Sequence, residues 1–365
     1  MKVKEIISIT EKQWPLQQAE DFDNVGLLCG NPDREVTGIL LCHDALEEVV
    51  DEAIETNCNL IICFHPIIFS GLKSLTGRNY VERSVIKALE NKIAIYAIHT
   101  ALDNDLFGVN YRICKELGLE NMKVLMPKQK QLSYLSVYVP KDNADGVEQA
   151  IFDAGAGHIG FYDQCRFKLS GEGSFRPLDG ANPRIGSVEQ REYVEEVQLS
   201  FVFETYKKNK ILAAMKAAHP YEEVAYQIYS LENDNQYEGL GQYGELKEET
   251  DAVTFLTFVK EKFGLDVIRH SKIPNRKIKK VGVLGGSGAS GIKAAIGAGC
   301  DIYLSGDFKY HDFFLAENRI ILADIGHFES EQFVVEQLYE FFSEKFTKFA
   351  ILKTNIKTNP VNYFL

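Results

Sequence analysis

Short apolar runs alternate with amphipathic segments in the first third of the chain. The apolar runs predict buried strands at residues 36–42, 60–64 and 93–98. The segments that follow them, at 46–55, 81–89 and 109–117, have helical periodicity. An amphipathic helix that Pro15 ends precedes the first strand. Such alternation is typical of a mostly parallel sheet with helices on both faces.

The same alternation returns after residue 246. It predicts a helix at 252–263, a strand at 280–284, a helix at 291–298, strands at 302–304 and 320–323, one long helix from about 329 to 345, and a last strand at 349–353. Both ends of the chain therefore belong to one fold class, an α/β core.

The middle of the chain has a different pattern. Strands are expected at 132–139, around 165–170, at 195–203 and at 223–231, with helices at 144–154 and 207–218. The order β-α-β-β-α-β, with an extra Gly-rich hairpin, is that of a ferredoxin-like α+β module. We therefore predict a core made of residues 1–126 and 246–365, interrupted by an insert at 127–245.

Composition narrows the class of protein. A length of 365 residues favours two domains. The net charge of −12 argues against a nucleic-acid partner, because such binding depends on neutralising phosphates. Seven cysteines without a C-x-x-C pair suit a reducing compartment. With no signal-peptide core and no apolar run long enough for a membrane, a cytoplasmic protein is expected.

Polar side chains follow the predicted strands at the point where each strand ends. Ligands of parallel sheets gather beyond the carboxyl ends of the strands, so these side chains are expected at one edge of the sheet. The residues in this position are His43, Asp44, His65, His99, Asp103, Asp324, His327 and Glu331.

Imidazole nitrogens and carboxylate oxygens are the usual ligands of zinc, manganese and iron. We predict a divalent metal site of His65, Asp103, His327 and Glu331, with two cations per chain and Asp103 as a bridging carboxylate. Zinc is the first choice, and iron or manganese are the alternatives. Taken singly, a strand-end histidine is more often a capping residue, and His327 and Glu331 could be a plain i,i+4 helix pair.

A glycine-rich loop, VGVLGGSGASG at 281–291, lies between a predicted strand and a helix. Gly286, Ser287 and Gly288 could offer backbone N–H groups to an anion or a substrate. The alternative is a dinucleotide fingerprint, for which Asp307 would be the acidic residue. His99 and His311 are the candidate acid–base residues.

Six motifs together resemble one family. DFDNVGLLCG, ICFHPIIF, HTALDN, GGSGAS, SGDFKYHD and DIGHFESE stand in the order found in Nif-three-like proteins, also labelled GTP cyclohydrolase 1 type 2 homologues. The resemblance covers essentially the whole chain. The central segment is similar to the CutA-like or PII-like insert of the longer bacterial members.

The resemblance implies a dinuclear metal site near the inner wall of a toroidal homohexamer, and it points to protein partners as well as a small anionic ligand. Its ligands would be the histidines of a His-His-Pro motif, then Asp103, His327 and Glu331. Here Phe64 stands in place of the first of those histidines and only His65 remains. The residues within reach that could replace the missing ligand are His43, Cys63 and His99.

Three functions follow from these observations. The first is a metal-dependent hydrolase acting on a nucleotide or another phosphorylated small molecule. The second is a metal-dependent regulatory or ligand-binding protein without turnover, which the loss of a ligand at Phe64 would favour. The third, a dinucleotide-dependent oxidoreductase, rests on the glycine loop alone.

Overall fold

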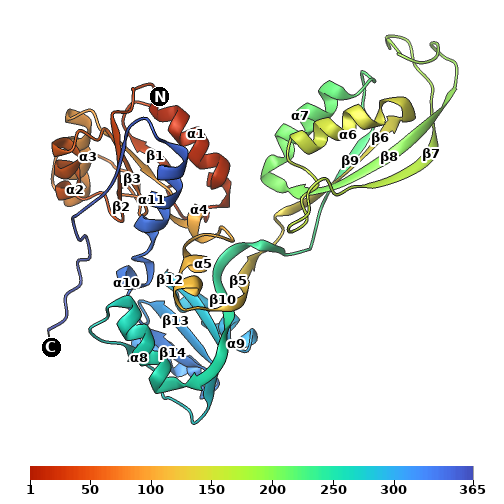
Figure 1. Cartoon of the computed structure of the whole chain (residues 1–365). Coiled ribbons are helices and arrows are strands. Elements are labelled where there is room, and N and C mark those ends of the chain that lie inside the picture. The colour runs from red at the N-terminus through yellow and green to blue at the C-terminus, as the bar shows by residue number, and fades with distance from the viewer. Residues whose placement is uncertain (365) are drawn as a thin grey trace. The chain divides into compact units, whose positions relative to one another are not determined.

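The computed structural model describes residues 1–364, which form two compact units (Figure 1). The first unit consists of Met1–Pro127 and the chain from Tyr237 onward, and the second of Lys128–Gln236. The insert was predicted at 127–245, so the two descriptions differ at its end. The difference falls within one long strand, β10 (Asn235–Asp251).

A five-stranded sheet is built mainly from the first third of the chain. Its strands lie in the order β1-β4-β3-β2-β15, and all neighbours are parallel except β1 and β4. The bounds are β1 Gly26–Cys29, β2 Gly38–Cys42, β3 Leu60–Cys63, β4 Ala94–Ala97 and β15 Ala350–Lys353. The predicted strands at 36–42, 60–64 and 93–98 are confirmed.

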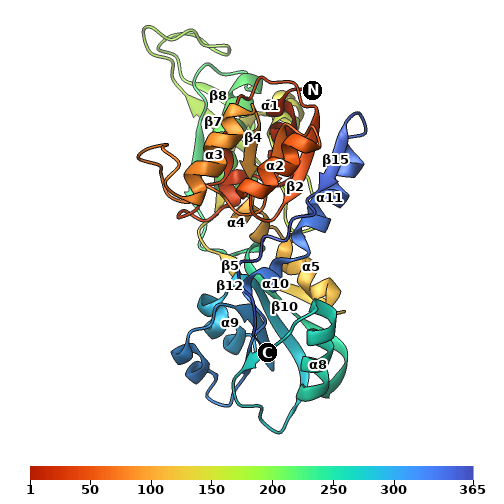
Figure 2. The same ribbon diagram turned by 90° about the vertical axis from the view of Figure 1, so that its left-hand side faces the viewer.

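Helices cover both faces of this sheet, and β2, β3 and β4 are therefore buried along their whole length. One face packs on α2 (Glu47–Glu55) and α3 (Tyr80–Glu90), which lie side by side in Figure 2. The other face packs against α1 (Val3–Gln13) and α11 (Val334–Lys345). The α/β fold class is thereby confirmed.

A six-stranded sheet forms the rest of the first unit, in the order β11-β14-β13-β12-β10-β5. Strands β12, β13 and β14 are parallel, and β10 and β11 pair antiparallel to them. The bounds are β5 Glu120–Lys128, β11 Arg269–His270, β12 Lys277–Ser287, β13 Ile302–Gly306 and β14 Ile321–Asp324. Its helices are α5 Val109–Glu116, α8 Ala252–Phe263 and α9 Ile292–Gly297, and the short α4 is His99–Asp103.

Two predictions about this unit were wrong in detail. The long helix expected from 329 to 345 is two helices, α10 (His327–Glu331) and α11. At the break, the Gln332 side-chain amide donates to the carbonyl groups of Glu329 and Phe263, and so competes for a helix carbonyl. The strand ends that were expected at one edge of a single sheet belong to two sheets. Strands β2, β3 and β4 lie in the five-stranded sheet, and β14 lies in the six-stranded sheet.

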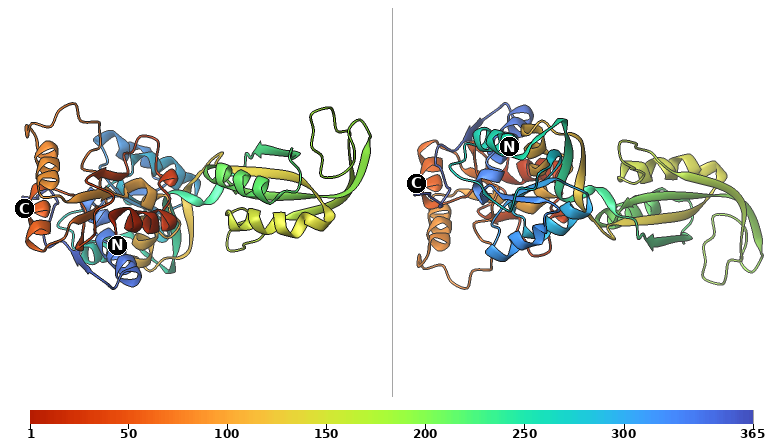
Figure 3. Two further views of the ribbon diagram at one scale, coloured as in Figure 1. Left: turned by 90° about the horizontal axis from the view of Figure 1, so that it is seen from above. Right: turned by 90° about the horizontal axis from the view of Figure 1, so that it is seen from below.

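The second unit has the predicted ferredoxin-like order. Its four antiparallel strands lie in the order β7-β8-β6-β9, and α6 and α7 pack together on the sheet (Figure 3). The bounds are β6 Leu132–Pro140, α6 Ala144–Asp153, β7 Phe167–Phe175, β8 Glu192–Glu204, α7 Lys208–Ala218 and β9 Tyr226–Ser230. In the part of the chain that is described, no helix is both long and apolar enough to cross a bilayer.

Each unit has its own hydrophobic core, so we expect two separable unfolding transitions. Leu135 and Ile302 are fully buried, in the core of the insert and of the first unit respectively. Truncating either to alanine should cost about 2–5 kcal/mol. Calorimetry should show Leu135→Ala lowering one transition temperature and Ile302→Ala the other. A single transition that both variants shift equally would contradict this.

Candidate metal centre

Strand ends of both sheets in the first unit deliver histidines to one place. His43 follows β2, His65 comes two residues after β3, and His99 begins α4 just beyond β4. His327 begins α10, three residues after β14 of the other sheet. The rings of His43 and His65 have centroids 4.5 Å apart, and those of His65 and His327 are 5.4 Å apart.

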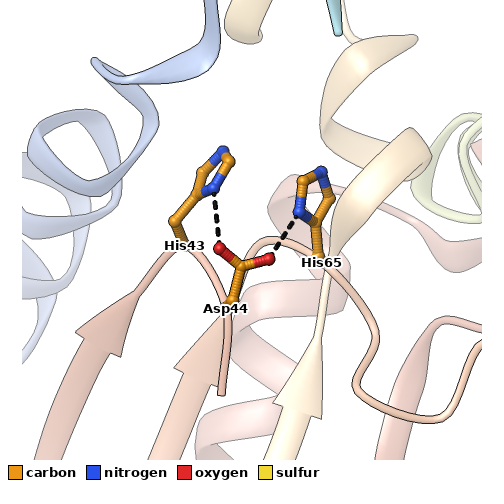
Figure 4. A group of neighbouring side chains, drawn as sticks. All are labelled: His43, Asp44 and His65. Atoms are coloured by element: carbon orange, nitrogen blue, oxygen red, sulfur yellow. Dashed lines mark hydrogen bonds and ion pairs between the residues drawn. The ribbon is translucent and has the colours of Figure 1, made fainter. Parts of the chain in front are cut away.

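An aspartate holds Nδ1 of every one of these histidines. Asp44 accepts from His43 at 3.2 Å and from His65 at 2.8 Å, one bond on each carboxylate oxygen (Figure 4). Asp23 accepts from His99 at 2.8 Å, and Asp307 accepts from His327 at 2.7 Å. Because an ionised carboxylate can only accept, each Nδ1 carries a proton, so Nε2 is the nitrogen of each ring that could bind a metal once it is free of its own proton. This is the arrangement in which proteins present histidine to a metal.

Two residues of this arrangement have unusual backbone angles. His99 has φ of 32° and Asp307 has φ of 58°, in a region that side chains other than glycine rarely adopt. Such conformations cost about 1–3 kcal/mol each and persist where the surrounding structure enforces them. Both residues belong to the histidine–aspartate pairs.

Glu331 lies at the centre of the histidines. Its Oε2 is 3.2 Å from Nε2 of His43 and 3.4 Å from Nε2 of His65. Nε2 of His327, on the preceding turn of α10, is also 3.4 Å away. Glu331 is only 3% exposed and His43 only 4%. Within residues 1–364, neither Glu331 Oε2 nor His43 Nε2 has a hydrogen-bond partner.

Asp103 is a further buried carboxylate near this cluster, at the end of α4. It is 6% exposed, and its Oδ1 has no hydrogen-bond partner among the described residues. Burial raises the pKa of Asp103 well above its usual range, and the negative charge of Glu331 raises it further. A cation bound beside Asp103 would remove both penalties, because buried charges need a partner.

The electrostatics of the cluster are those of a site built for positive charge. Burial alone would lower the pKa of His65, but Asp44 and Glu331 outweigh it and raise that pKa to about 10. Burial alone would also lower the pKa of His43, but Asp44 and Glu331 outweigh it and raise that pKa. The pKa values of Asp44 and Glu331 are lowered despite burial, because histidines surround both carboxylates.

The spacing of the nitrogens and the oxygen fits a metal ion. Zinc bonds of about 2.0–2.1 Å in a tetrahedron place neighbouring ligand atoms about 3.3–3.4 Å apart. His65 Nε2, His327 Nε2 and Glu331 Oε2 are separated by 3.4, 3.4 and 3.5 Å, which is one face of such a tetrahedron. His43, Asp44 and His65 also lie close together, but there the nitrogens already donate to Asp44. The triad of His65, His327 and Glu331 is therefore the better candidate.

The glycine-rich loop packs against this cluster. The N–H of Gly285 donates to Asn110, that of Gly286 to Ser330, and that of Gly288 to the carbonyl of Gly306. The N–H groups of Gly286 and Gly288 are therefore occupied within the protein, and the anion-binding role of Gly286, Ser287 and Gly288 stays a prediction. Ser287, the last residue of β12, is exposed.

Glycine is needed at 286 for a different reason. Its φ is 69°, and an added Cβ would lie 2.4 Å from Glu331 Oε1. The loop is thus shaped to admit the carboxylate. Asp307, suggested as the acid of a dinucleotide site, accepts from His327 instead.

The structure leaves His311 outside the cluster. His311 is exposed in a 3₁₀ segment, where its ring meets that of Tyr310 edge-on and that of Phe314 at a tilt. His99 does lie in the cluster, with its ring centroid 5.1 Å from that of His65.

Sequence reasoning missed three supporting residues. The sequence pattern does not single out Asp23, Thr358 or Asn110. Thr358, near the C-terminus, donates to Asp44 Oδ2 at 2.6 Å. Asp23 stands inside the quoted motif DFDNVG, which was the one signal available; nothing in the local sequence around Thr358 or Asn110 distinguishes them.

Asp44→Asn should weaken zinc binding about 10–100-fold, the usual effect of losing such a support. Asp44 uses both oxygens to accept from two rings, whereas asparagine has a single acceptor oxygen and must leave one ring unsupported. Zinc titration would measure the loss. Asp51→Asn is the matched control, since Asp51 pairs with Lys87 on the surface. Equal affinities in both variants would contradict the assignment.

Gly286→Ala should lower zinc affinity at least about tenfold, because the methyl group displaces Glu331, and should also destabilise the fold by about 1 kcal/mol. Gly297→Ala at the end of α9 is the control, since its Cβ would meet nothing within 4 Å. Thermal denaturation and zinc titration of both variants test this. Retained affinity in Gly286→Ala would show that Glu331 does not need the space.

Comparison with known proteins agrees with this fold. The family model of Duf34/NIF3 (NGG1p interacting factor 3) matches residues 1–360. A protein of Bacillus subtilis (strain 168) named "GTP cyclohydrolase 1 type 2 homolog" is 38% identical over 368 residues, which is 99% of this chain and 98% of that protein.

Solved structures show the same relationship. A Bacillus cereus protein related to NIF3 has a TM-score of 0.86 at 36% identity, covering 100% of this chain and 99% of its own. Staphylococcus aureus protein SA1388 has a TM-score of 0.79 at 30% identity, with the same coverage. The chain therefore belongs to the Duf34/NIF3 (NGG1p interacting factor 3) family.

Proposed function

We propose that this protein is a divalent-metal-dependent hydrolase that acts on a nucleotide or another phosphorylated small molecule. The observation that carries the proposal is the buried Glu331 Oε2, which lies within 3.4 Å of three imidazole nitrogens without a hydrogen bond to any of them. His65, Asp103, His327 and Glu331 would hold two cations, with zinc as the first choice.

When bound, such cations lower the pKa of a coordinated water and offset the negative charge of a phosphorylated substrate. The chain's own residues prepare the place for this. Asp44 and Asp307 fix the rings of His65 and His327, so that no ring has to reorient on binding. The N–H of Gly286 fixes Ser330, next to Glu331, in the same way.

His99 is the proposed acid–base residue. Asp23 holds its Nδ1 at 2.8 Å and also accepts from the backbone N–H of Thr100, so the ring is fixed beside His65. Its Nε2 can then take up or release a proton during hydrolysis. Hydrolytic opening of a ring in GTP, which the name of the Bacillus subtilis relative suggests, would use the same groups.

A second candidate function is ligand binding without turnover, with the insert as the sensing element. A cavity of about 800 Å³ in the insert favours it. Two arginines and two tyrosines, Arg176, Arg184, Tyr138 and Tyr221, line the cavity together with Glu196. Such a mixture of aromatic and charged side chains suits a small polar ligand.

His327→Ala should lose zinc and turnover together, because it removes one nitrogen and unpairs Asp307. His158→Ala, on the exposed surface of the insert, is the matched control. The measurement is zinc content by elemental analysis, followed by a hydrolysis assay with a panel of nucleotides with and without chelator. Zinc without turnover of any nucleotide would favour the second candidate. Absence of bound metal after reconstitution would refute the proposal.

A further inference from the structure

Position 64 lacks the ligand that the family resemblance implies. Phe64 is fully buried and cannot coordinate a metal. If the site holds two cations, another side chain must supply the missing donor. The candidates are the three residues near Phe64 with a nitrogen or sulfur donor, namely His43, Cys63 and His99, and the structure distinguishes them.

Cys63 faces away from the cluster. It packs with Cys42 and Ala97 in the core beneath α2 and α3, whereas Phe64 belongs to the core on the other face of the sheet. Its thiol donates to the carbonyl of Tyr96 at 3.4 Å.

His99 lies beside the cluster but makes no close approach to its central carboxylate. Its ring contacts those of Phe64 and His65 edge-on. In the described part of the chain, no hydrogen bond or ion pair joins His99 to Glu331.

His43 alone combines the three properties of a ligand. Its Nδ1 is held by Asp44, its Nε2 is buried without a hydrogen-bond partner among the described residues, and that nitrogen lies 3.2 Å from Glu331 Oε2. The spacing is close to the ligand–ligand separation of about 3.3 Å around a tetrahedral zinc ion.

Phe64 has a packing role in this arrangement. Its ring stacks on that of His43 with centroids 5.5 Å apart and planes at 26°. The ring of Phe328 meets that of His43 edge-on, with centroids 4.9 Å apart. The two aromatic rings confine the imidazole, which lowers the entropy lost when it binds a ligand.

We propose that His43 is a metal ligand that replaces the missing histidine at position 64, sharing Glu331 Oε2 with His65 and His327. The ligand set then has five side chains, His43, His65, Asp103, His327 and Glu331. The donor has moved from the end of β3 to the end of the neighbouring strand β2, and both strands deliver it to the same carboxylate. This inference rests on the proposed metal centre.

The metal content of the full-length protein, reconstituted with zinc and then dialysed, tests whether His43 replaces the histidine that is missing at position 64. Wild type should hold about two zinc ions per chain, and His43→Leu about one. Adding Phe64→His to His43→Leu should return the content to about two, because the rings at 43 and 64 lie side by side. Cys63→Ala is the control and should match wild type.

Cobalt absorption spectra give a second readout, since the intensity and position of the visible bands report the coordination number and the donor atoms around the ion. Loss of band intensity in His43→Leu and its recovery in the double variant support the exchange. An unchanged content and spectrum in a folded His43→Leu, checked by circular dichroism, overturn the role of His43 while leaving the metal centre standing. A wild type that binds no metal overturns the metal centre and this inference together.

Discussion

A carboxylate buried among imidazoles is the constraint around which this unit is organised. Removing an ionised carboxylate from water costs several kcal/mol unless compensating charge and hydrogen bonds are provided. Nitrogens of three histidines lie near Glu331 Oε2, and these come from the ends of β2 and β3 and from α10. Both sheets must therefore be correctly placed before this carboxylate can be accommodated.

Much of the surrounding structure follows from that demand. Gly286 has no side chain because Glu331 occupies the space, and Ser330 is tied to the loop by the N–H of Gly286. Asp44 and Asp307 orient the rings that face the carboxylate. Each of these features would be unexplained if Glu331 were an ordinary surface residue one turn after His327.

The sequence predicted the strands, most helices and the ferredoxin-like order of the insert, because apolar periodicity reports directly on burial. It also predicted that His65, His99 and His327 share a region, since carboxyl ends of parallel strands collect ligands. It could not show that two sheets contribute, because strand pairing is set by contacts distant in sequence. The partners Asp23 and Thr358 were missed for the same reason: each lies far along the chain from the residue it supports. At the break between α10 and α11, Gln332 donates to the distant carbonyl of Phe263, a contact that local periodicity does not encode.

The sharing of Asp44 has a thermodynamic consequence. One carboxylate accepts from both His43 and His65, and Thr358 fixes that carboxylate from the C-terminal segment. Ordering Asp44 for one ring orders it for the other, so the entropy of fixing it is lost once for two donors. Asp44 therefore couples the orientation of both rings to the C-terminal segment, because Thr358 donates to the same carboxylate. A change that loosens this segment would disturb both rings at once.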